Sequence, residues 1–214
     1  MKNTVIKIIL FILAAVPVAA QSGGASRGQE AKNEQVRLSA LRDIEKYSSD
    51  IEKYPDDPDA YLARAKAYVR SGRFEEAIGD LTKAIAVSKH PYYVAQATTD
   101  RGEVYFKLGE YAKASDDFST VIGLSSADAY KPGAFLNRTR SRIAEGKFAE
   151  ARQDANEAIK LYSVMKARNA KKRLGEAYNL RSAINCADGK TAAARADNSK
   201  AASLGAPMAK CGLR

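Results

Sequence analysis

Apolar residues recur at the three- and four-residue spacing of amphipathic helices along most of this chain, and four glycine-centred triplets interrupt the pattern. The triplets are Ser71-Gly72-Arg73, Leu108-Gly109-Glu110, Glu145-Gly146-Lys147 and Asp188-Gly189-Lys190, with glycines 37, 37 and 43 residues apart. Because glycine adopts a positive φ at no steric cost, a glycine between two helical patterns predicts a tight turn. The sequence therefore predicts an all-α chain of four helical hairpins.

The residues that follow each glycine also repeat. They are Phe74, Tyr111, Phe148 and Thr191 two positions later, Ala77, Ala114, Ala151 and Ala194 five positions later, and Ala84, Val121, Ala158 and Ala201 twelve positions later. Small residues at fixed positions allow two helices to approach closely, and the larger apolar residues fill the space between them. Each hairpin is therefore expected to pack along one apolar face.

A charged pattern is symmetrical about each glycine. Arginine lies eight residues before it and aspartate eight residues after it, which gives Arg64 and Asp80, Arg101 and Asp117, Arg138 and Asp154, and Arg181 and Asp197. In an antiparallel hairpin, positions equidistant from the turn lie at the same height. We expect an ion pair within each repeat that fixes the register of the two helices; a row of ligand-binding arginines is the alternative.

These patterns resemble the tetratricopeptide repeat, a two-helix unit of 34 residues. The first unit carries the residues that the family favours, namely Tyr61, Ala65, Tyr68, Gly72, Phe74, Ala77, Leu81 and Ala84. The resemblance covers residues 58–204 and implies a right-handed α-solenoid of about four hairpins. The expected units are 58–91, 95–128, 132–165 and 175–208, followed by a tail over 205–214. Lengthened helices are expected around residues 162–173, where the repeat is longer.

An amphipathic helix is expected before the repeats. Leu41, Ile44, Tyr47, Ile51 and Tyr54 recur at helical spacing within residues 30–57, and the sequence PDDP at 55–58 ends the pattern. We interpret this segment as a cap that buries the exposed side of the first repeat.

The first residues have the pattern of a secretory signal peptide. Lys2 and Lys7 precede an uncharged apolar run over 8–20, and Val18, Ala19 and Ala20 are the small residues expected before a cleavage site. An uncleaved N-terminal anchor is the alternative. Residues 21–29, rich in glycine and serine, are expected to form a flexible linker. The protein is accordingly expected to be periplasmic or secreted.

Charge is distributed unevenly, with a net value of +10 over the whole chain. Residues 131–214 contain 18 basic and seven acidic residues, whereas residues 21–130 contain 15 basic and 18 acidic ones. This asymmetry favours an anionic partner, and export argues against nucleic acid. Anionic lipid, cell-wall polymer or an acidic protein remain, as does simple solvation of helix surfaces.

Two cysteines, Cys186 and Cys211, leave two interpretations open. Their spacing fits no metal site and no CxxC redox motif, but an even number of cysteines in an oxidising compartment suggests a disulfide. Such a bond would join the C-terminal tail to the last hairpin. Two independent thiols are the alternative.

The function favoured by the sequence is non-catalytic protein binding. His90 is the only histidine, and no motif for nucleotide, metal or covalent catalysis is present, so no cofactor or small-molecule substrate is expected. The family resemblance places a concave groove along the first helix of each hairpin. Its expected lining is Leu62, Lys66, Val69, Thr99, Glu103, Phe106, Leu136, Arg140, Ile143, Asn179, Ala183 and Cys186, although some of these could instead pack in the core. An envelope scaffold that binds a protein partner there is the main hypothesis. Binding of an anionic membrane or cell-wall polymer through the basic C-terminal half is the alternative.

Overall fold

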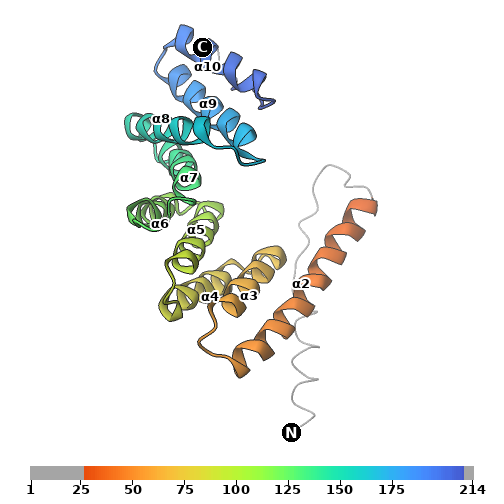
Figure 1. Ribbon diagram of the computed structural model, residues 1–214. Coiled ribbons are helices and arrows are strands. Elements are labelled where there is room, and N and C mark those ends of the chain that lie inside the picture. The colour runs from red at the N-terminus through yellow and green to blue at the C-terminus, as the bar shows by residue number, and fades with distance from the viewer. Residues whose placement is uncertain (1–26, 210–214) are drawn as a thin grey trace. The chain divides into compact units, whose positions relative to one another are not determined.

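The computed structural model describes residues 27–209 (Figure 1). The predicted signal peptide lies outside these residues, as do most of the predicted linker and Cys211. The first helix begins at Arg27, so the last three residues assigned to the linker are helical instead. Gln29 donates a hydrogen bond from Nε2 to Oδ1 of Asn33 at 3.1 Å, one helical turn later. Polar residues of this kind suit a helix as well as a linker, which is why composition alone placed the boundary too late.

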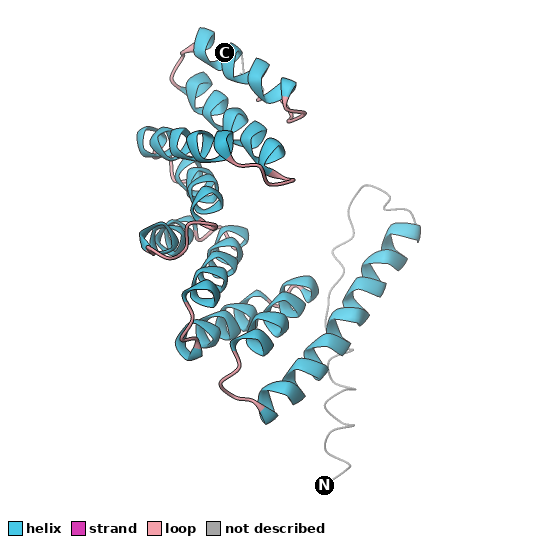
Figure 2. Ribbon diagram, in the orientation of Figure 1, coloured by secondary structure: helices cyan, strands magenta, loops and turns pink. Residues whose placement is uncertain are grey.

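Residues 27–209 form nine helices, and no strand occurs among them (Figure 2). The helices are α2 (Arg27–Lys53), α3 (Pro58–Ser71), α4 (Phe74–Val87), α5 (Pro91–Lys107), α6 (Tyr111–Gly123), α7 (Lys131–Ala144), α8 (Phe148–Val164), α9 (Ala170–Ala187) and α10 (Thr191–Ser203). Each of α4 to α10 packs against the helix that precedes it in the chain. The predicted all-α solenoid is thus confirmed. Within this part of the chain, no helix combines the length and apolar character needed to cross a bilayer.

The chain divides into two compact units, Met1–Gln35 and Val36–Arg214, and the hairpins all belong to the second. Within the second unit, α2 contacts the first hairpin. Ile51 packs against the cluster that contains Tyr61 and Leu81, and Arg70 of α3 pairs with Asp43. The interpretation of this helix as a cap stays a prediction.

The four predicted turn glycines, Gly72, Gly109, Gly146 and Gly189, all have φ between 72° and 78°. At the first turn the Arg73 amide donates to the Tyr68 carbonyl at 2.9 Å, and the Gly72 amide donates to the Val69 carbonyl at 3.2 Å. These bonds satisfy carbonyls that the end of α3 leaves without helical partners. The glycine-centred turns predicted from the sequence are therefore confirmed.

Two hairpins begin earlier than the expected unit boundaries. The second begins at Pro91 rather than residue 95, because proline suits the first position of a helix and His90 caps it. The Nδ1 atom of His90 accepts a hydrogen bond from the Tyr92 amide at 3.2 Å. The fourth begins at Ala170, and α8 and α9 contain 17 and 18 residues against 13 for α10. The long helices expected around residues 162–173 are present, but a loop at 165–169 separates them.

Alanine dominates the contacts between helices. Ala77, Ala114, Ala151 and Ala194 are completely buried, as are their counterparts seven residues later, Ala84, Val121, Ala158 and Ala201. Larger side chains such as Leu81, Phe118 and Leu136 fill the spaces between them. The small residues bring helix backbones close together, so the core is thin and continuous along the repeats.

The C-terminal tail packs against the last hairpin. Asn198 of α10 donates to the Ala209 carbonyl at 3.0 Å and accepts from the Ala209 amide at 2.9 Å. A Cβ atom added to Gly175 of α9 would lie 2.7 Å from the Cβ of Ala206, so only glycine allows the tail to approach. Asn198 therefore replaces the large apolar residue usual at this repeat position because it binds the tail backbone.

Close packing at Gly102 leads to a first prediction. A Cβ added to this residue of α5 would lie 2.9 Å from Cε1 of the buried Phe118 ring, which has no room to move. We expect Gly102→Ala to lower the free energy of unfolding by about 1–3 kcal/mol, measured by urea denaturation. Gly79→Ala is the matched control, because Gly79 lies in α4 with nothing within 4 Å of the added Cβ. It should raise stability by about 0.5–1 kcal/mol, and equal effects of the two variants would contradict this description of the packing.

Candidate protein-binding groove

The arginine and aspartate that are symmetrical about each turn glycine form a bidentate ion pair in all four hairpins. In each pair the arginine Nε donates to one carboxylate oxygen at 2.8–3.0 Å, and Nη2 donates to the other at 2.6–2.7 Å. This parallel arrangement is the strongest geometry available to a guanidinium and a carboxylate. The pairs join Arg64 to Asp80, Arg101 to Asp117, Arg138 to Asp154 and Arg181 to Asp197.

The remaining Nη1 group of each arginine reaches back to the preceding helix. Arg64 donates to Ser48 Oγ at 3.0 Å, Arg101 to Thr82 Oγ1 at 3.0 Å, Arg138 to Ser119 Oγ at 2.8 Å and Arg181 to Asn156 Oδ1 at 2.8 Å. Thr82, Ser119 and Asn156 each lie two residues after the aspartate of the preceding hairpin. Each arginine thus connects three helices. A polar residue two positions after each aspartate is visible in the sequence, but its role was not predicted from it.

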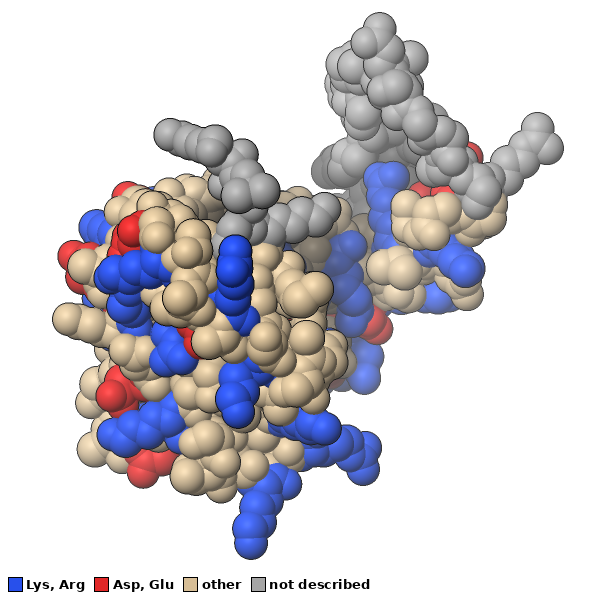
Figure 3. Space-filling view, turned by 90° about the horizontal axis from the view of Figure 1, so that it is seen from above, with Lys and Arg blue, Asp and Glu red and all other residues tan. Residues whose placement is uncertain are grey.

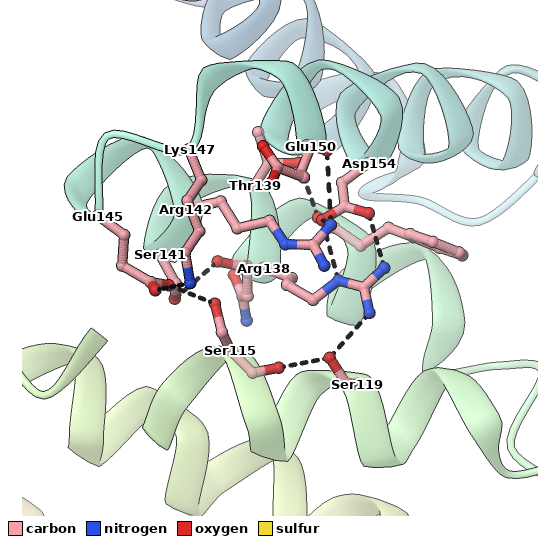
Figure 4. A network of polar contacts seen from close by, with 12 residues as sticks. Ser115, Ser119, Arg138, Thr139, Ser141, Arg142, Glu145, Lys147, Glu150 and Asp154 are labelled. Carbon is pink, nitrogen blue, oxygen red and sulfur yellow. Dashed lines mark hydrogen bonds and ion pairs between the residues drawn. The ribbon is translucent and has the colours of Figure 1, made fainter. Parts of the chain in front are cut away.

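Asp154 is the most heavily engaged of the four aspartates. Besides Arg138, it accepts a hydrogen bond at 2.6 Å from Nη1 of Arg142, and its side chain is only 3% exposed (Figure 4). Figure 4 shows both guanidinium groups directed at this carboxylate, with Ser119 completing the contacts of Arg138. One buried carboxylate therefore pairs with two cations.

The contacts support a structural role for the arginines rather than ligand binding. All three nitrogens of each guanidinium already donate to protein partners in the described part of the chain. Hydrogen bonding to the aspartate raises the pKa of Arg64, Arg101 and Arg181 above the ordinary arginine value. These side chains therefore remain cationic, and the pairs persist across the physiological pH range.

A second prediction follows from Asp154. We expect Asp154→Asn to lower the free energy of unfolding by about 3–5 kcal/mol, because it leaves the charges of Arg138 and Arg142 without a counter-ion. Asp117→Asn, which removes the charge opposite one arginine, should cost about 2 kcal/mol. Asp116→Asn is the control, since this neighbouring side chain is exposed and forms no ion pair in the described structure. It should stay within about 0.5 kcal/mol of wild type in chemical denaturation.

The first helices of successive hairpins lie next to one another and are connected by polar contacts. Lys66 Nζ of α3 lies 3.8 Å from Asp100 Oδ2 of α5, Asn137 Nδ2 of α7 donates to Glu103 Oε1 of α5 at 3.0 Å, and Arg140 of α7 pairs with Glu176 of α9 at 3.0 Å. This row of contacts marks the face formed by α3, α5, α7 and α9. We call this face the groove.

Two adjoining pockets lie along the groove. The first, of about 310 Å³, lies between α3 and α5, and the second, of about 260 Å³, lies between α5 and α7. The first is lined by Ala65, Lys66, Val69, Arg70, Leu81, Asp100, Glu103, Val104 and Lys107, and the second by Glu103, Phe106, Lys107, Phe118, Asn137, Arg140 and Arg173. Glu103 and Lys107 belong to both pockets. The two pockets together therefore offer a continuous surface of apolar and charged side chains.

Five of the expected groove residues line these two pockets: Lys66, Val69, Glu103, Phe106 and Arg140. Leu62 and Leu136 do not, because they are 3% and 1% exposed and pack in the core. Thr99, Ile143, Asn179 and Ala183 are partly buried and line neither pocket. The two leucines thus follow the alternative that the sequence left open, in which some of these positions pack in the core.

Asp100 and Lys107 are groove residues that the sequence did not single out. Lys107 forms no ion pair within residues 27–209 and projects where the two pockets meet. Asp100 Oδ2 is buried without a hydrogen-bond partner in that part of the chain. Burial raises the pKa of Asp100 to about 6, Lys66 opposes this effect, and the charge of Glu103 adds to it. The groove therefore contains one unpaired cation and one carboxylate that titrates close to neutral pH.

The raised pKa of Asp100 yields a third prediction. Between pH 4 and pH 6 the folded protein retains a proton that the unfolded chain has lost, so this residue lowers stability as the pH rises through that window. Asp100→Asn should therefore be more stable than wild type at pH 7 by about 1–2 kcal/mol. The difference should vanish as the pH falls below about 3, because Asp100 is then protonated in both the folded and the unfolded state. Thermal or urea denaturation at several pH values measures this, and a constant difference would contradict the assigned titration.

Catalytic and metal-binding features were not expected, and the described part of the chain contains no group of three or more His, Cys, Asp or Glu side chains that could hold a metal ion. His90 lies outside the groove at the start of α5, where it serves as a helix cap. The suggested Cys186–Cys211 disulfide involves a residue outside the described range and stays a prediction.

Comparisons with known proteins agree with this architecture. The family model described as tetratricopeptide repeat matches residues 40–93 and 62–129. A crystal structure of MamA is similar over 86% of this chain and 96% of its own, with 17% sequence identity and a TM-score of 0.65. MamA from Desulfovibrio magneticus RS-1 covers 81% of this chain and 95% of its own, at 13% identity and a TM-score of 0.63. BtubC from P. vanneervenii covers 80% and 90%, at 14% identity and a TM-score of 0.61. No curated protein matches the sequence.

The fold and the groove define an α-solenoid of the repeat class whose members generally mediate protein–protein interactions. Residues 40–129 match the tetratricopeptide-repeat family by sequence, and the hairpins that follow share the α-solenoid fold of the solved structures. The solved structures are less than 20% identical to it, so their likeness concerns the fold alone.

Proposed function

We propose that this protein is a non-catalytic scaffold that binds an extended segment of a partner protein in the groove. The observation that supports this most directly is the pair of adjoining pockets on α3, α5 and α7, which share Glu103 and Lys107. Two adjoining pockets suit an extended peptide, because successive side chains of the peptide can occupy successive pockets while its backbone runs between them.

The chemistry of the groove suggests which segment it binds. Val69 and Phe106 offer apolar contact surface, and Phe106 is held against Tyr111 with ring centroids 5.2 Å apart. Among the cations that line the two pockets, Lys107 is the one without a carboxylate partner in the described residues. We therefore propose a segment with an apolar side chain in each pocket and a carboxylate between them that pairs with Lys107.

The cellular location is part of the same proposal. The basic start, the apolar run over 8–20 and the small residues before Gln21 support export to the cell envelope. Mass determination of the protein isolated from its native source tests this. A first residue at Gln21 would agree with the proposal, and a chain retaining Met1 would contradict cleavage.

A fourth prediction tests the groove. A photo-crosslinking residue in place of Val69 should capture a partner, whereas the same residue in place of Lys83, exposed on α4, should not. Mass spectrometry of the crosslinked product identifies the contacting segment, which is then synthesised as a peptide. The variant Phe106→Ala with Lys107→Glu should bind this peptide about thirtyfold or more weakly, because it removes an apolar anchor and reverses the recognising charge.

The matched control replaces an exposed aromatic residue and a lysine outside the groove, as Tyr92→Ala with Lys89→Glu. This variant should bind the peptide with wild-type affinity, and circular dichroism should show that both variants remain folded. Equal affinity of the groove variant and the control would refute docking in the groove. Crosslinking from position 83 but not from position 69 would do the same.

A further inference from the structure

The loop between α8 and α9 presents apolar side chains to solvent. Val164 ends α8 and is 77% exposed, the highest exposure of any large hydrophobic residue in the described chain, and Met165 beside it is 36% exposed. Neither lines either groove pocket. Exposed apolar side chains in a loop between two hairpins do not contribute to the core. Their exposure therefore requires another explanation.

Cations surround this apolar pair. Lys166, Arg168, Lys171 and Lys172 are all exposed, and none forms an ion pair within residues 27–209. Lys160 lies one helical turn before Val164 and is paired only with Glu157, at 3.6 Å. Residues 158–175 contain six basic residues and no acidic one. Seen from the end of the molecule that carries α10, Lys and Arg side chains also clearly outnumber Asp and Glu (Figure 3).

The start of α9 adds to the positive potential. Lys171 and Lys172 occupy its first turn, where the helix dipole favours anions, and the turn contains no acidic residue. The capping position, Asn169, provides no side-chain hydrogen bond to the free amides. This arrangement lowers the stability of the helix end on its own, and an external anion beside it would offset that effect.

We infer that residues 160–172 form a docking surface for an anionic lipid bilayer, with Val164 and Met165 entering the interfacial region and the flanking cations contacting lipid headgroups. We call these residues the loop surface. The apolar pair favours a bilayer over a soluble polyanion, because only a bilayer provides both negative charge and an apolar phase next to it. None of residues 160–172 lines the two groove pockets, so a partner bound in those pockets would be held at the membrane.

Sedimentation with lipid vesicles tests the inference on the full chain. The vesicles contain about one-third phosphatidylglycerol in phosphatidylcholine, at about 0.15 M salt. Each cation near such a surface contributes about fivefold in affinity, so changing Lys166, Arg168, Lys171 and Lys172 to glutamate should weaken binding at least a hundredfold. Val164→Ser with Met165→Ser should weaken it about tenfold. Neither variant should bind pure phosphatidylcholine.

A charge-matched control changes Lys32, Lys53, Lys83 and Lys89, all exposed and distant in sequence from the loop, to glutamate. Since screening limits electrostatic effects to about 8 Å at this salt concentration, the control should bind within a few-fold of wild type. Equal losses for the control and the loop variant would overturn the inference by showing that only net charge matters. Wild-type binding by the serine variant would also overturn it, since a site for a polyanion would then explain the cations.

A fluorescence measurement reports insertion directly. The chain contains no tryptophan, so Val164→Trp introduces a single probe at the apolar tip. Its emission should shift to shorter wavelength on addition of the phosphatidylglycerol vesicles, and Lys83→Trp should show no shift. An unchanged spectrum for the probe at position 164 would contradict entry of the loop into the bilayer, whatever the sedimentation result.

Discussion

The guanidinium–carboxylate pair inside each hairpin is the interaction on which the rest of this structure depends. It is largely buried, bidentate and repeated in every hairpin at the same distance from the turn. A pair of this kind adds little net stability compared with apolar packing, but it penalises every register in which one charge loses its partner. Its main contribution is therefore to specify how the two helices of a repeat align.

Because polar contacts determine alignment, the helix contacts can be built from alanine. Small side chains interlock weakly, so a core built from them would allow one helix of a hairpin to shift along the other. The ion pairs prevent this shift. Close approach of the backbones then leaves the bulkier apolar residues Val69 and Phe106 on the groove, where they line its pockets.

Most of the fold could be predicted because its determinants are local. Turn glycines, alanine positions and the arginine–aspartate symmetry all lie within one hairpin, and the backbone geometry of a hairpin follows from them. The groove was predicted less well, since its lining depends on how neighbouring hairpins pack. Leu62 and Leu136 occupy suitable repeat positions but are covered by the next helix, and the burial that perturbs Asp100 arises between repeats. The beginning of α2 was misplaced because linkers and solvated helices share a composition.

The third hydrogen bond of each arginine has a direction. In all four arginines the Nη1 group donates to a helix that precedes the arginine in the chain, and not to a later one; these are Arg64, Arg101, Arg138 and Arg181. A chain that folds from its N-terminus can therefore satisfy each buried arginine as soon as the second helix of its hairpin is available. Contacts of this polarity allow the solenoid to be completed hairpin by hairpin, so that few of these charges are buried unpaired during folding.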